Sequence, residues 1–95
     1  MSTIFKYHLD IRDEQILYLP AGHKILSVHE QAGSLMLWAI VDPSIEETVP
    51  RVIHIRGTGH PMPKGEDVRF INTVLLLEGS LVFHVFWSRC NVKRV

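Results

Sequence analysis

The chain has 95 residues, and its ten Lys and Arg residues balance ten Asp and Glu residues, so its formal net charge is zero. This length leaves room for a single domain, and the balanced charge argues against a general nucleic-acid binder, which needs a basic excess. With 46% hydrophobic and 21% charged residues, the chain is too apolar to be disordered. A domain of this size buries only about 60–65% of the surface of its unfolded chain, so we expect a homo-oligomer.

The cellular compartment is predicted from the single cysteine and from the absence of long apolar runs. Cys90 has no second cysteine to pair with, and small secreted domains usually carry several, which favours a reducing cytoplasm. The N-terminal residues are too polar for a signal peptide. The longest apolar run, residues 35–41, is far shorter than the roughly 20 residues of a membrane span. We therefore predict a cytoplasmic protein with no membrane partner.

Short segments of alternating apolar and polar residues, separated by turn residues, follow one another along the chain. This period of two is typical of half-buried strands, and it predicts strands at residues 5–11, 15–19, 24–29, 34–41, 51–56, 68–77 and 81–87. Segment 34–41 is apolar at both alternations, which predicts cover on both of its faces, by this chain or by a partner subunit. The polar connection 45–50 is expected to be one helical turn or a mobile loop.

These seven segments predict an all-β fold, an antiparallel sandwich or a small barrel of about seven strands. We place them in one domain covering residues 1–95. The polar, basic end of the chain, residues 88–95, is expected to be a flexible or interface tail.

A glycine-rich segment follows the fifth expected strand. Glycines let main-chain N–H groups converge on an anion such as phosphate, and the neighbouring side chains add further donors. The candidate phosphate ligands are Arg56, Gly57, Thr58, Gly59, His60 and Lys64. The segment contains neither a P-loop motif nor GxGxxG. An ordinary loop whose turns need glycine would look the same, so both interpretations stay open.

Histidine and tryptophan residues supply the remaining candidates. The closest histidine pairs, such as His54 and His60, are six residues apart, which is not a typical metal-ligand spacing, and we predict neither a metal nor a cofactor. His84 is expected in the core or in a pocket, with one hydrogen-bond partner. Trp38 and Trp87 could stack on a purine ring, although packing between two sheets is the stronger interpretation of both.

Catalysis is not favoured by the sequence. Cys90 lies near the end of the chain, no serine occupies a nucleophile elbow, and no two carboxylates can be paired as general acid and base. We therefore assign no catalytic residue.

Several motifs together resemble a family of short β-proteins encoded by phages and prophages. They are Ile-x-Lys-Tyr at 4–7, Asp-Glu-Gln at 13–15, Pro-x-Gly-x-Lys-Ile-Leu-Ser-Val at 20–28, Leu-Trp-Ala-x-Val-Asp-Pro at 37–43, Gly-Thr-Gly-His-Pro at 57–61 and Leu-Val-Phe-His-Val-Phe at 81–86. The resemblance covers nearly the whole chain. It implies a counter-defence protein that acts in the host cytoplasm during infection.

By this resemblance the protein would sequester a nucleotide-derived bacterial immune signal, either ADP-ribose-like or a cyclic nucleotide, without cleaving it. The glycine-rich segment would bind the phosphates, Trp38 or Trp87 would stack on the base, and His84 would line a pocket at a homo-oligomer interface. Such a pocket suits a small subunit, because each protomer supplies part of the wall.

Two other classes of function remain open. One is a protein-interaction module that inhibits a host protein through an exposed sheet face or edge near Trp38. The other is a small nucleotide hydrolase in which His54, His60 or His84 acts as general base beside a carboxylate.

Overall fold

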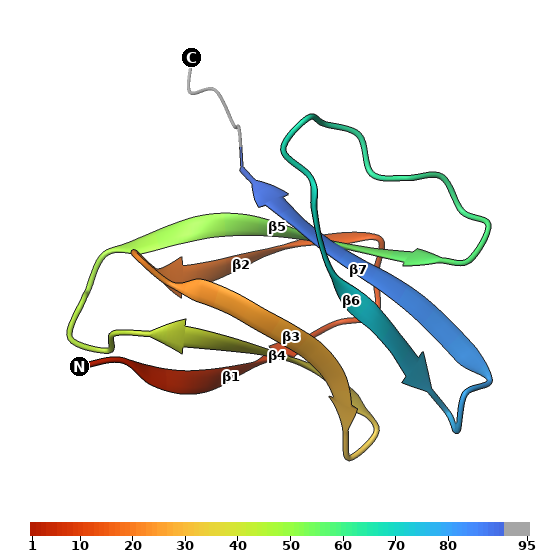
Figure 1. The fold of residues 1–95 in the computed structure, drawn as a ribbon, viewed down its shortest axis with the longest axis horizontal. Coiled ribbons are helices and arrows are strands. Elements are labelled where there is room, and N and C mark those ends of the chain that lie inside the picture. The colour runs from red at the N-terminus through yellow and green to blue at the C-terminus, as the bar shows by residue number, and fades with distance from the viewer. Residues whose placement is uncertain (91–95) are drawn as a thin grey trace.

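The computed structural model describes residues 1–90, which form seven strands and no helix. The strands are β1 (Thr3–Leu9), β2 (Glu14–Pro20), β3 (Lys24–Gln31), β4 (Ser34–Val41), β5 (Thr48–Gly57), β6 (Arg69–Leu76) and β7 (Leu81–Arg89). They pair antiparallel into a three-stranded sheet of order β1-β4-β3 and a four-stranded sheet of order β2-β5-β7-β6. The predicted all-β sandwich is therefore confirmed (Figure 1).

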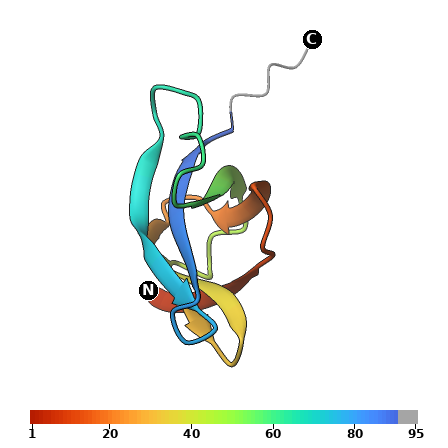
Figure 2. The same cartoon turned by 90° about the vertical axis from the view of Figure 1, so that its right-hand side faces the viewer.

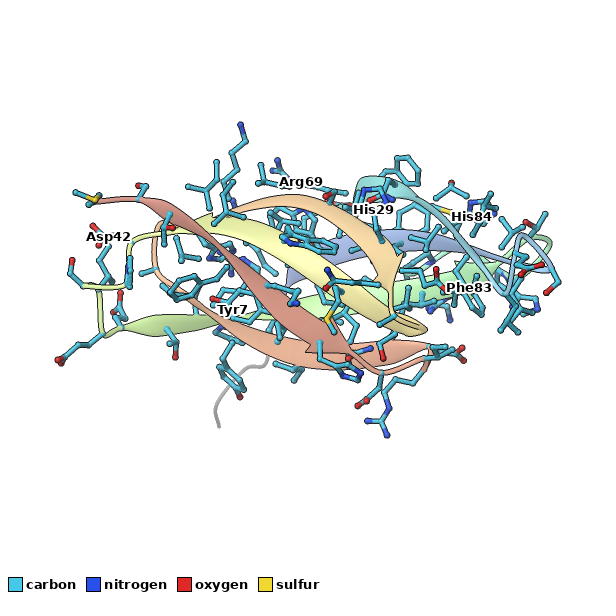
Figure 3. All side chains as sticks on the ribbon, turned by 90° about the horizontal axis from the view of Figure 1, so that it is seen from below. Tyr7, His29, Asp42, Arg69, Phe83 and His84 are labelled. Carbon is cyan, nitrogen blue, oxygen red and sulfur yellow. The ribbon has the colours of Figure 1, made fainter. Side chains whose placement is uncertain are left out.

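The two sheets form the layers of the sandwich, and their strands cross at an angle in projection (Figures 1 and 2). Burial alternates along β4, although its sequence is apolar on both faces: Leu35, Leu37, Ala39 and Val41 are buried, while the residues between them are half-buried on the outer face. Side chains from both sheets fill the space between the layers (Figure 3). Because side chains in a strand alternate between faces, one apolar residue in two is enough to build this core.

Side-chain amides join the two sheets along both open sides of the sandwich. On one side Asn72 of β6 binds Val28 of β3 twice: its Oδ1 accepts from the Val28 N–H at 2.8 Å, and its Nδ2 donates to the Val28 carbonyl at 2.7 Å. On the other side Gln15 of β2 binds the N–H and the carbonyl of Asp10 at 3.0 and 2.7 Å. Each amide thus takes the place of a neighbouring strand for one residue of the opposite sheet.

Several predicted boundaries need correction. The first strand ends at Leu9 rather than at residue 11, because the main chain of Asp10 turns to the Gln15 amide. The connection 45–50 is not a helical turn or loop throughout, since β5 begins at Thr48 and residues 48–50 pair with the end of β2.

The predicted tail also begins later than expected. Ser88 and Arg89 belong to β7, where they pair with Val52 and Arg51. Residues 91–95 lie outside the described part of the chain. Strand β4 is covered on one face by this chain, while the half-buried side chains on its other face include Trp38.

Candidate functional site

A pocket of about 660 Å³ opens where the segment between β5 and β6 meets the outer face of the four-stranded sheet. Its floor comes from β2 and β5 and its rim from the residues that follow β5. The lining residues are Asp13, Glu14, Val52, His54, Arg56, His60, Pro61, Met62 and Lys64. Of the residues predicted to bind phosphate, the structure brings three into this pocket: Arg56, His60 and Lys64.

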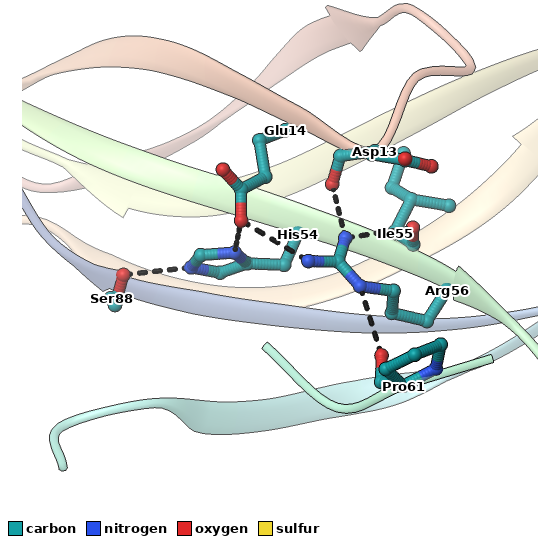
Figure 4. A network of polar contacts seen from close by, with 7 residues as sticks. All are labelled: Asp13, Glu14, His54, Ile55, Arg56, Pro61 and Ser88. Carbon is teal, nitrogen blue, oxygen red and sulfur yellow. Dashed lines mark hydrogen bonds and ion pairs between the residues drawn. The ribbon is translucent and has the colours of Figure 1, made fainter. Parts of the chain in front are cut away.

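A chain of hydrogen bonds crosses the sheet beneath the pocket, from β2 through β5 to β7 (Figure 4). Glu14 and His54 are opposite each other in the β2–β5 register, and the Glu14 carboxylate lies 3.0 Å from His54 Nδ1. The Ser88 hydroxyl lies 2.8 Å from His54 Nε2. A carboxylate can only accept, so Nδ1 carries the ring hydrogen, and in the neutral ring Nε2 accepts from Ser88.

This series of hydrogen bonds has one buried end and one exposed end. His54 and Ser88 are 4% and 6% exposed, whereas the Glu14 side chain is half exposed. Hydrogen bonds from His54 and then from Arg56 lower the pKa of Glu14 below its ordinary value. Glu14 therefore remains ionised at neutral pH and holds the imidazole ring in one orientation.

Arg56 fastens the rim of the pocket to the sheet. Its Nε donates to the Pro61 carbonyl at 3.2 Å, one terminal nitrogen donates to the Asp13 carbonyl at 2.6 Å, and the other contacts the Glu14 carboxylate at 3.1 Å. All three guanidinium nitrogens thus have partners within the chain (Figure 4). Since its charge is already paired with Glu14, Arg56 is better placed to position this site than to receive a phosphate directly.

The glycine-rich segment forms a tight turn at the start of the rim. The His60 N–H donates to the Gly57 carbonyl at 3.1 Å, and Gly59 has a φ of 90°, a conformation that side-chain-bearing residues rarely adopt. A Cβ on Gly57 would stand 3.1 Å from the His60 ring. Gly57 is therefore needed for the close approach of the His60 ring, and Gly59 is needed for the positive φ of the turn.

Thr58 and His84 are joined in a second network, away from the pocket lining. The Thr58 hydroxyl lies 2.8 Å from His84 Nε2, and the Thr73 hydroxyl lies 2.9 Å from His84 Nδ1. His84 stands on β7 next to Phe83 (Figure 3). The network ties the glycine turn to β6 and β7, so Thr58 and His84 have structural partners that the sequence did not reveal.

The two tryptophans lie apart from the pocket and from each other. Trp38 is on the outer face of the three-stranded sheet, its ring centroid 6.1 Å from that of His29, so the prediction that it packs between the two sheets is wrong. Trp87 packs against the core, with the guanidinium carbons of Arg51 and Arg69 each 5.5 Å from the ring centroid. The predicted site residues thus divide among several places, and within one chain neither indole reaches the pocket lining.

Two pocket residues carry donors that the fold does not use. The described residues provide no hydrogen-bond partner for the imidazole of His60 or the ammonium group of Lys64, and both side chains are exposed. Sequence reasoning missed the opposite wall, formed by Asp13 and Glu14. It also considered His54 as a general base without pairing it with Glu14 or Ser88, because only the strand register brings residues 14, 54 and 88 together.

Among residues 1–90 no group of three His, Cys, Asp or Glu side chains is arranged to hold a metal ion. The same part of the chain has no helix long and apolar enough to cross a membrane.

The fold and the pocket define a small antiparallel β-sandwich with a surface pocket of mixed charge. Residues 1–94 match the model of the family described as a domain of unknown function, DUF7352, and the chain belongs to that family. Neither the curated proteins nor the solved structures contain a match.

Proposed function

We propose that the pocket binds a phosphate-bearing small molecule of nucleotide type and holds it without cleaving it. One observation carries the proposal: a pocket of about 660 Å³ presents Lys64 and His60 with donors unused by the described residues. This volume lies within the range of roughly 300–1,000 Å³ that is typical of small-molecule sites. An ammonium group and an imidazole are both suitable donors to phosphate oxygens.

The other walls match the remaining parts of a nucleotide. The carboxylates of Asp13 and Glu14 are hydrogen-bond acceptors, which suits ribose hydroxyls. Val52, Pro61 and Met62 add apolar surface against which a base can lie. Because Arg56 already neutralises Glu14, the phosphate is expected at the Lys64 end of the pocket and the sugar at the Glu14 end.

Isothermal titration calorimetry tests this proposal with ADP-ribose, a cyclic dinucleotide and inorganic phosphate. A charge-assisted hydrogen bond contributes about 1.5–3 kcal/mol, so Lys64→Gln is expected to weaken binding by roughly 10- to 150-fold. Lys24→Gln, which removes a lysine from β3 in the other sheet, serves as the matched control and should bind as the native protein does. Absence of heat with every ligand, or equal affinity in Lys64→Gln, would refute the proposal.

Sequestration of a bacterial immune signal is the biological role that we propose for such binding. It requires the ligand to be returned unchanged, so mass spectrometry after heat denaturation of the complex should recover intact ligand in stoichiometric amount. The further expectation that a second protomer contributes to the wall stays a prediction.

Hydrolysis is the second candidate, and the arrangement of Ser88, His54 and Glu14 favours it. Hydroxyl on Nε2 and carboxylate on Nδ1 is the order found in serine hydrolases. However, Ser88 is 6% exposed and does not line the pocket, so a substrate would have to reach it beneath the surface. Product formation that is lost in Ser88→Ala would establish this function in place of the first.

A further inference from the structure

Strand β1 is an edge strand that carries none of the usual protection against pairing with another chain. It pairs only with β4, so every second residue directs its main-chain N–H and C=O groups away from the sheet. Natural edge strands are usually guarded by a proline, a bulge or a charged side chain. Strand β1 contains no proline, and its register with β4 runs from Thr3 to Leu9 without a shift.

The one charged residue of β1 that could guard the edge is turned away from it. Lys6 Nζ donates to the Gln31 side chain on β3 at 2.7 Å. The lysine side chain therefore extends across β4 towards β3, away from the free edge of β1. The opposite edge of the same sheet is capped within β3 by the Asn72 amide on Val28, whereas the Gln15 amide binds only Asp10, one residue beyond the end of β1. Among the strands of the three-stranded sheet, β1 thus presents the open edge (Figure 3, foreground).

Apolar side chains on both faces of β1 remain exposed beside this edge. Ile4 is 57% exposed on the outer face and Phe5 is 44% exposed, although Phe5 lies opposite Ala39, a core residue. An aromatic side chain that points to the core side and is still nearly half exposed leaves apolar surface that a neighbour beyond the edge would bury. A further strand would cover it.

We propose that two copies of this chain pair through β1, antiparallel, to form a continuous six-stranded sheet. The sequence of the strand is compatible with itself in one register. With Phe5 opposite Phe5, two half-exposed aromatic rings face each other and Lys6 stands opposite Ile4. Aromatic cross-strand pairs are stabilising, whereas like charges directly opposite are destabilising, which disfavours the register that would place Lys6 opposite Lys6.

Sedimentation equilibrium of the native chain gives the first test, over protein concentrations from about 1 µM to about 1 mM, the range in which weak dimers form. The mass is expected to rise to that of a dimer. Ile4→Lys places a charge at the edge and is expected to weaken the dimer by about tenfold or more. Leu75→Lys is the matched control, because Leu75 is 60% exposed on β6, the edge strand on the opposite side of the sandwich, and it should dimerise as the native chain does.

Cross-linking tests the register and remains decisive should Ile4→Lys fail to fold. In a Cys90→Ser background, Phe5→Cys should form an intermolecular disulfide, because directly opposite residues of antiparallel strands have Cα atoms about 4.5–5.5 Å apart, within the range of about 4.4–6.8 Å that a disulfide spans. Leu75→Cys in the same background should form no intermolecular disulfide under the same oxidation. A native chain that is monomeric at every concentration, or equal cross-linking at positions 5 and 75, would overturn the proposal.

Discussion

Removing the hydroxyl of Ser88 tests whether the hydrogen-bond chain beneath the pocket supports the fold rather than catalysis. Ser88 Oγ is the only described partner of His54 Nε2, at 2.8 Å, and both residues are almost fully buried. In Ser88→Ala the ring nitrogen keeps its burial and loses its partner. An unsatisfied buried polar group costs about 1–3 kcal/mol, so the free energy of unfolding should fall by about that amount.

Urea denaturation followed by circular dichroism measures this change, with an unaltered m-value as the sign that the extent of unfolding is the same. Ser80→Ala is the matched control, because the Ser80 hydroxyl also makes a 2.8 Å hydrogen bond, but in an exposed turn. It should cost less than about 0.5 kcal/mol. Ligand affinity should stay within about twofold of the native value in both variants, since neither serine lines the pocket.

Two results would refute the reasoning. A change in Ser88→Ala no larger than in Ser80→Ala would mean that water satisfies His54 as well as the hydroxyl does. Loss of a measurable hydrolytic activity in Ser88→Ala, with stability retained, would mean that the chain of bonds serves chemistry instead.

Three further predictions concern the Asn72–Val28 hydrogen bonds between the sheets, the ionised Glu14 and the glycine turn. Asn72→Ala leaves the N–H and the carbonyl of the fully buried Val28 without partners, so the free energy of unfolding should fall by about 2–4 kcal/mol. Hydrogen exchange at the Val28 amide should also accelerate, and unchanged exchange there would contradict the role of the Asn72–Val28 hydrogen bonds. The folded-state pKa of Glu14 lies below its ordinary value, so its stabilising contribution is present above about pH 4.5 and is lost as the pH falls through the lowered pKa. Between about pH 6 and 3, the free energy of unfolding should therefore fall less steeply in Glu14→Gln than in the native chain. Parallel curves would contradict the assignment. In Gly57→Ala the new Cβ would stand 3.1 Å from the His60 ring, so the NMR signals of that ring should shift and ligand affinity should fall several-fold, whereas an unmoved ring would show that His60 does not pack on Gly57.

The sequence by itself determined the class of the fold and most of the strands. Alternation of apolar and polar residues within β1 depends only on the period of two in an extended chain, so it can be counted without coordinates. The tight turn at Gly59 was also visible, since its positive φ is a local property of a residue that lacks a Cβ. Strand ends were less accurate, because β1 ends at Leu9 only through the hydrogen bonds of the next residue, Asp10, to the Gln15 side chain on β2.

Which residues form the candidate site was decided by the tertiary structure. Strand pairing places Glu14 and Ser88 on either side of His54, and the intervening 39 and 33 residues carry no sign of that meeting. The same pairing gave Arg56 partners within the chain and put Trp38 in the opposite sheet. The residue order determines the local properties of each segment. Which side chains share a surface depends on sheet order and register, because these follow from the packing of the whole chain.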